Sequence, residues 1–149
     1  MIRKLAIPLA LCANALFATA QADQTIIGFV KIVEGEATIT SAATSVAAKP
    51  GASLYLGNVL KTGKDGSLGI TFKDNTVMSF GPDTEVTVDE YLYAPANGEL
   101  KLVARLAKGT LHYISGVIAK LKPEAVSVKT PTGVIGVRGT RFLVKTEGE

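Results

Sequence analysis

The sequence has no tryptophan and only one histidine among its 149 residues, and these shortages exclude several classes of site. The neighbours of His112, Leu111 and Tyr113, are expected to face a core, which turns His112 toward solvent. One surface histidine cannot make a Ser/His/Asp triad. Zinc would depend on carboxylates, and their spacing suggests no zinc site. We therefore expect no catalytic, cofactor-binding or metal site, and a protein that is not an enzyme.

Cysteine is also nearly absent, and the one copy, Cys12, lies in a segment with the pattern of a secretory signal peptide. A basic start precedes an apolar run over residues 5–18, and Ala20-Gln21-Ala22 has the small residues of a cleavage site. The run is shorter than the ~20 residues that a spanning helix needs. Leu11 before Cys12 argues against lipidation. We expect residues 1–22 to be a signal peptide cleaved after Ala22.

Cleavage would leave residues 23–149 as a single periplasmic or secreted domain with no cysteine and no stable membrane span. This mature chain has no disulfide to stabilise it, so its stability must come from its core. Without Arg3 and Lys4 it carries 14 basic and 13 acidic residues, a net charge of +1. So small an excess removes the main support for a nucleic-acid partner.

Basic residues are scarce in the first part of the mature chain, and acidic residues are scarce in the last part. Residues 23–99 hold five basic and ten acidic residues, and residues 100–149 hold nine basic and three acidic residues. Two interpretations stand. The two parts complement each other within the fold, or the later part presents a positive face to an anionic partner.

Short alternating runs fill the mature chain, and no helical period is sustained. In residues 67–73, Leu68, Ile70 and Phe72 point one way. Leu100, Leu102, Ala104 and Leu106 alternate in the same manner. The small, polar residues 41–51 indicate a loop. Some ten strands with frequent turns predict an all-β domain, as a sandwich, a barrel or a solenoid.

The run from Thr130 to Phe142 organises the end of the chain. Ile135 and Val137 share one face, but Phe142 and Val144 follow the opposite parity. A strand cannot change parity without an inserted residue or a turn. Gly139 is the natural position for this kink, because glycine enters positive φ without a Cβ penalty.

Three segments resemble the FecR-type periplasmic domain. They are Thr130-Pro131 with Val137-Arg138-Gly139-Thr140, the run Gly57 to Gly63, and the turn Phe72 to Thr76. Together they cover roughly residues 54–144. Asn58 stands where the family usually has aspartate, and Asn75 where it has glycine, although asparagine also tolerates a left-handed turn.

The resemblance implies a twisted, solenoid-like or sandwich-like double layer of short strands. In its best-known setting such a domain belongs to a regulator with a membrane helix and a cytoplasmic segment that holds a sigma factor. We find neither part in this sequence. We therefore expect a freestanding interaction or sensory module of the cell envelope, which docks onto another envelope protein.

Four basic residues are the candidate partner-binding set: Lys120, Lys122, Arg138 and Arg141. Arg138 matches the arginine of the family motif. It either forms a structural ion pair or grips a carboxylate or sulfate on a partner. The alternative function is a glycan or cell-wall binder, with an anionic glycan as one ligand. The aromatic rings for sugar stacking would be Tyr91, Tyr93 and Tyr113.

Overall fold

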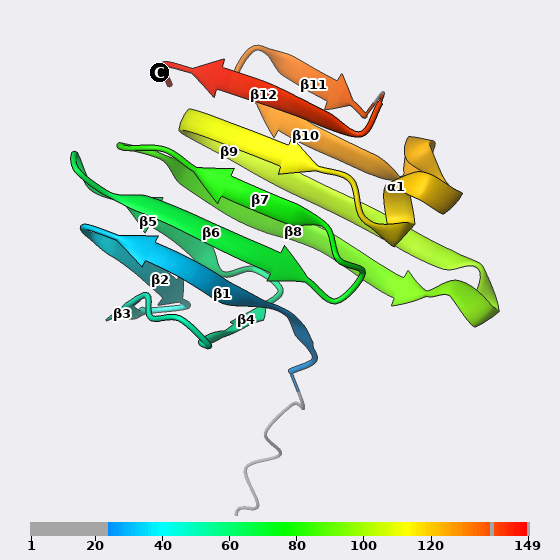
Figure 1. Cartoon of the computed structure of the whole chain (residues 1–149), viewed down its shortest axis with the longest axis horizontal. Coiled ribbons are helices and arrows are strands. Elements are labelled where there is room, and N and C mark those ends of the chain that lie inside the picture. Colours follow the sequence, from blue (N-terminus) through cyan, green and yellow to red (C-terminus); the bar gives the residue numbers. More distant parts are fainter. Residues whose placement is uncertain (1–23, 138, 149) are drawn as a thin grey trace, which may run out of the picture.

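The computed structural model describes residues 24–137 and 139–148, which are mostly β-strand (Figure 1). The expected signal peptide and Arg138 lie outside the described residues. The elements are β1 (Ile26–Glu34), β2 (Ala37–Ser41), β3 (Thr44–Ala47), β4 (Ser53–Tyr55), β5 (Val59–Thr62), β6 (Ser67–Phe72), β7 (Val77–Phe80), β8 (Glu85–Ala94), η1 (Pro95–Asn97), β9 (Glu99–Ile114), α1 (Val117–Leu121), η2 (Pro123–Ala125), β10 (Val126–Thr130), β11 (Gly133–Gly136) and β12 (Arg141–Thr146).

The strands form one sheet that curls into two facing halves (Figure 1). The first half contains β4, β1, β6, β7, the C-terminal part of β9, and β12. The second half contains β3, β2, β5, β8, the N-terminal part of β9, β10 and β11. The described pairs are antiparallel except β9 with β10, which α1 and η2 connect. The predicted all-β double layer is confirmed.

The core lies between the two halves and follows the alternation in the sequence. In β6, Leu68, Ile70 and Phe72 are buried, while the residues between them are half-buried. In β9, Leu102 and Leu106 are fully buried and Lys101 is exposed on the other face. Both patterns were expected, because a half-buried strand alternates with a period of two.

The long strand β9 belongs to both halves and bends at Gly109. Its residues Glu99–Lys108 pair with β8 in the second half, and Gly109–Ile114 pair with β12 in the first. Gly109 has φ +96° at this transition. The buried Thr84 lies beside the bend, and its Oγ1 accepts a hydrogen bond from Thr110 N at 3.0 Å. A glycine is needed here because both the backbone angle and the close approach of Thr84 oppose a side chain.

Two elements differ from the sequence-based expectation. Within the predicted loop of residues 41–51, Thr44–Ala47 is instead an exposed strand, β3, that pairs with β2. This edge strand buries no side chains, so its sequence shows no alternation of apolar and polar residues that would indicate a strand. Sequence reasoning also missed α1, which is five residues long and so too short to show a helical period. Within the described part of the chain, no helix has the length and apolar character needed to cross a membrane.

The change of parity near the end of the chain marks the point where the chain crosses from one half of the sheet to the other. β11 pairs with β10 in the second half, and β12 pairs with β9 in the first. Gly139 lies between them with φ +88°, so the predicted positive φ is confirmed. The Ser115 side chain secures this crossing, because its Oγ donates to the Gly139 carbonyl at 3.2 Å.

Replacing Gly139 by valine should destabilise the fold by about 1–3 kcal/mol, because a β-branched residue is strained at positive φ. A Cβ would meet nothing within 4 Å at Gly139, so backbone strain alone carries the effect. Gly136→Val is the matched control, since that site is equally open and lacks a positive φ. Thermal unfolding of both variants checks this. Equal melting temperatures would contradict it.

Candidate functional site

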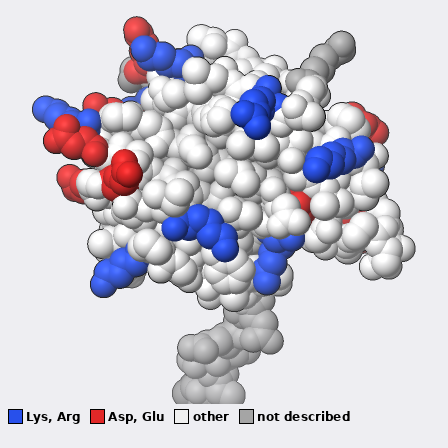
Figure 2. Space-filling model, in the orientation of Figure 1, with Lys and Arg blue, Asp and Glu red and all other residues white. Residues whose placement is uncertain are grey.

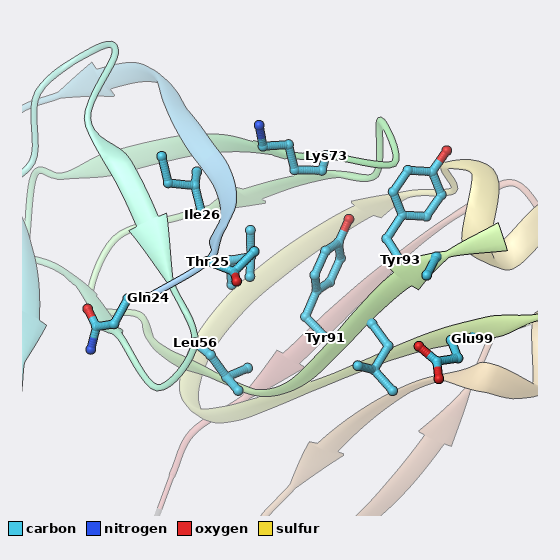
Figure 3. A pocket seen from close by; sticks show the side chains of 11 residues that line it. Gln24, Thr25, Ile26, Leu56, Lys73, Tyr91, Tyr93 and Glu99 are labelled. Atoms are coloured by element: carbon cyan, nitrogen blue, oxygen red, sulfur yellow. The ribbon is translucent and has the colours of Figure 1, made fainter. Parts of the chain in front are cut away.

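A groove beside the C-terminal part of β8 is lined by exposed apolar side chains (Figure 3). We call it the β8 groove, lined by residues 24–27, Leu56, Lys73, residues 91–94 and Glu99. Its volume is ≈ 950 Å³. Leu56 and Leu92 are 52% and 50% exposed, and Tyr93 is 36% exposed. Large exposed apolar side chains gathered in a concavity are typical of an interaction site.

The groove exists because β8 runs past its neighbour β5. On one side β8 pairs with β9 over its whole length, from Glu85 to Ala94. On the other side β5 pairs only with Glu85, Val86 and Thr87, and the Gly57 N–H then donates to the Val88 carbonyl. A β-bulge between Val88 and Glu90 follows. The rest of β8 has no partner strand on that side among the described residues.

One wall of the groove is a tyrosine held rigidly by two contacts. The ring of Tyr91 stacks on Phe72 with 5.3 Å between ring centroids. Its hydroxyl donates to Asp74 Oδ1 at 3.0 Å and accepts from Asp74 N at 3.0 Å. Burial, and next the negative charge of Asp74, raise the pKa of Tyr91 above its usual range. The hydroxyl therefore stays protonated, and the ring is fixed before any ligand arrives.

Asp74 connects Tyr91 to α1. Its carboxylate is buried, and Oδ2 accepts from Thr76 Oγ1 at 2.7 Å and from Ile118 N at 3.0 Å. Its backbone carbonyl accepts from Val117 N at 2.8 Å. Each of these donors satisfies a buried acceptor, so Asp74 is a structural residue that ties the β6–β7 turn, β8 and α1 together.

Tyrosine-to-phenylalanine variants at two positions should differ in their effect on stability, because the two hydroxyls have different surroundings. Tyr91→Phe removes both hydrogen bonds to Asp74 and should cost about 1–3 kcal/mol. Tyr113 is fully buried, and its hydroxyl has no hydrogen-bond partner within the described residues. Tyr113→Phe should leave the stability unchanged or raise it by up to about 1 kcal/mol. Chemical unfolding of both variants checks this. A loss of stability in Tyr113→Phe as large as the loss in Tyr91→Phe would contradict it.

Two charged side chains lie at the groove. The Lys73 ammonium sits 5.1 Å from the centroid of the Phe29 ring, and no carboxylate pairs with it among the described ion pairs. Glu99 opens β9 and is exposed. Figure 3 shows Lys73 and Glu99 at different places on the rim. A ligand that brings charges of both signs could therefore be oriented in the groove.

The basic residues singled out in the sequence lie elsewhere. Lys120 and Lys122 are exposed in and after α1, and Arg141 is exposed at the start of β12. None of the three lines the β8 groove. Arg141 pairs with Ile114, and Ser115 N donates to the Thr140 carbonyl at 2.8 Å. The start of β12 thus lies beside the segment that leads into α1. Arg138 lies outside the described residues.

Ion pairs between β8 and β9 join the acidic first part of the mature chain to its basic last part. Arg105 Nη2 lies 2.7 Å from Asp89 Oδ1, and Lys101 Nζ lies 3.8 Å from Glu90 Oε2. Both pairs join an acidic residue before position 100 to a basic residue after it. Figure 2 shows Lys and Arg scattered over one face of the molecule rather than gathered in a single patch. Within the described residues, no group of three or more His, Cys, Asp or Glu side chains could hold a metal ion.

The two motif positions that depart from the resemblance have structural roles. Asn58 is buried, its Oδ1 accepts from Tyr55 N at 2.9 Å, and its Nδ2 donates to Ser41 Oγ at 2.7 Å. An aspartate could keep the first bond and accept the second from the serine hydroxyl. Asn75 has φ +67°, as expected for a residue that replaces a turn glycine. Both substitutions therefore preserve the local fold.

The match to a protein-family model decides the family. Residues 58–149 match the model described as "FecR protein", which covers more than half of the chain and contains the three motifs except for Gly57, the first residue of the earliest one. The chain belongs to the FecR family. This is a family of cell-envelope regulatory and sensory proteins. No curated protein and no solved structure matches the chain.

Proposed function

We propose that this FecR domain is a non-catalytic docking module that binds another cell-envelope protein through the β8 groove. The observation that carries the proposal is the grouping of Leu56, Leu92 and Tyr93 around one concavity. Such side chains usually contact a partner at the centre of an interface. The rigid Tyr91 supports it further, because a pre-ordered ring loses little entropy on binding.

Site-specific crosslinking tests this function. A photo-crosslinking residue at position 92 should give a discrete adduct with an envelope protein in living cells. The same residue at position 143 is the control, because Leu143 is 66% exposed on β12, away from the groove. Leu92→Asp should abolish co-purification of the crosslinked protein. The proposal fails if positions 92 and 143 give the same adducts, or if Leu92→Asp leaves co-purification intact.

We propose that Arg141, Lys120, Lys122 and Arg138 contribute a second, electrostatic contact to an anionic surface of the partner. The exposure of the first three supports this role. Arg141→Ala should then weaken binding without loss of stability, and the loss should shrink as salt screens exposed charges over roughly 10 Å at 0.1 M. Binding that depends on neither Arg141 nor salt would limit recognition to the groove.

Glycan binding is the second candidate, and the position of two tyrosines favours it. Tyr91 and Tyr93 both line the β8 groove. Tyr113 was also a candidate, but that expectation is wrong, because its ring is 0% exposed and stacks on Phe142. Calorimetric titration with cell-wall oligosaccharides distinguishes the two functions. Saturable binding that is lost in Tyr93→Ala, without a protein adduct at position 92, would favour the glycan.

The mature protein should begin at Asp23 and remain in the periplasm or be secreted. The basic start, the apolar run and Ala20-Gln21-Ala22 support cleavage after Ala22. The intact mass of the exported protein checks this. A mass that retains Cys12 or includes a lipid would contradict it.

A further inference from the structure

The β8 groove lies along a row of backbone groups that no described strand pairs with. From Glu90 to Ala94, β8 pairs with β9 on one side, and the part of the chain that the structure describes places no strand on the other. In an antiparallel pair, the N–H and C=O groups of alternate residues point away from the partner strand. The free side of this segment therefore offers alternating donors and acceptors. The groove-lining residues 91–94 belong to the same segment, so an apolar concavity and a free strand edge coincide.

The free edge has a defined length. The β-bulge between Val88 and Glu90 separates the part of β8 that β5 covers from the part that it leaves open. The chain turns away at η1, just beyond Ala94. Five residues of strand span about 16 Å at roughly 3.3 Å per residue. An occupant of this edge would therefore be a short extended segment that continues the line of β5.

The side chains around the edge match a strand with alternating residues. Tyr91 and Tyr93 point to one face of β8, and Leu92 points to the other. Leu56, just before β5, closes the end of the groove nearest that strand. An added strand could thus bury apolar side chains on both of its faces. Lys73, which also lines the groove, would meet an acidic residue of such a segment.

We propose that the β8 groove binds an extended segment of a partner protein, which adds a strand to the sheet beside Glu90–Ala94. This inference rests on the docking function proposed above and specifies its mode. Main-chain hydrogen bonds supply affinity in strand addition, and pockets for alternate side chains supply specificity. The segment has apolar residues at alternate positions, carries an acidic residue for Lys73, and has no proline where it pairs.

Selection of peptides from a displayed random library tests strand addition, with the mature protein, residues 23–149, as the target. The peptides should be about ten residues long, which covers the edge with short flanks. Enriched peptides should show the alternating pattern. Their binding should fall at least about tenfold, or about 1.4 kcal/mol, in Tyr93→Ala. Leu143→Ala is the control variant, and its binding should not change. Failure to enrich such peptides, or enrichment that survives Tyr93→Ala, overturns the proposal.

Backbone methylation of one enriched peptide separates strand addition from side-chain docking. N-methyl groups at every second residue should abolish binding in one parity and be tolerated in the other, because only one set of N–H groups faces β8. The amides of Glu90–Ala94 that face the groove should exchange more slowly in the complex. Equal tolerance of both parities, or unchanged exchange, overturns strand addition. The adduct at position 92 can still form in that case, so the docking function stands or falls separately.

Two other occupants are outcomes of the same experiment. If residues 1–22 of this chain fill the groove, Glu90–Ala94 should be protected from hydrogen exchange in the full chain, and the full chain should not bind the peptide that the mature chain binds. If a second copy fills it, the mature chain should dimerise with increasing concentration, and Leu92→Asp should remain monomeric. Either result would overturn the assignment of the groove to a partner protein.

Discussion

Gly109→Ala is expected to lower the free energy of unfolding by about 3–5 kcal/mol, because two costs combine at the bend of β9. An alanine would be forced to φ +96°, and its Cβ would lie 2.5 Å from the Thr84 Cα and closer still to Thr84 Oγ1. The contact with Thr84 Cα is a contact with backbone, so a change of rotamer cannot relieve it. The melting temperature should fall by more than about 10 °C.

Gly98→Ala is the matched control for this bend. Gly98 also has positive φ, at +68°, but a Cβ there would meet nothing within 4 Å. It should cost only the backbone strain of about 1–2 kcal/mol. The difference between the two variants measures the overlap with Thr84. Equal losses in Gly109→Ala and Gly98→Ala would show that β9 can move away from Thr84 without cost.

Asp74→Ala should have the second large effect, a loss of about 3–5 kcal/mol. It leaves the donors Thr76 Oγ1, Ile118 N and the Tyr91 hydroxyl without their acceptor in a buried region. We expect α1 to lose protection against hydrogen exchange, since Asp74 is its side-chain contact at the first turn. Equilibrium unfolding and amide exchange are the measurements.

Two further variants define the role of Asp74. Asp74→Asn retains one accepting oxygen but turns an amide toward a donor, so its loss should be smaller, about 1–3 kcal/mol. Asp65→Ala removes an exposed carboxylate from a turn and should change stability by no more than about 0.5 kcal/mol. A similar effect of Asp74→Ala and Asp65→Ala would contradict the proposed tie between β8 and α1.

The local pattern of the sequence was enough to predict most of the strands and the kink at Gly139. Each of these depends on residues close in sequence, such as the alternation of Leu68 and Ile70, or on a glycine at a change of parity. The resemblance to the FecR family added the double layer, which the structure confirms, and the family match over residues 58–149 confirmed the resemblance itself.

The groove could not be predicted, because it depends on where β5 stops relative to β8. Val59 pairs with Thr87, and no local pattern encodes that register. The expected basic residues were chosen from charge and, for Arg138, from the family motif, and neither reports ion pairs such as Arg105–Asp89. The tyrosine pair Tyr91 and Tyr93 gave the one available signal, because aromatic side chains at alternate positions of a strand share a face.

The passage of β9 through both halves of the sheet has a consequence for how the domain unfolds. Opening the first half requires the release of Gly109–Ile114, and opening the second requires the release of Glu99–Lys108. Because these segments are one uninterrupted strand, neither half has a boundary at which it can separate from the other. The two halves therefore behave as one cooperative unit in thermal unfolding, and an intermediate with only one half intact has no structural basis.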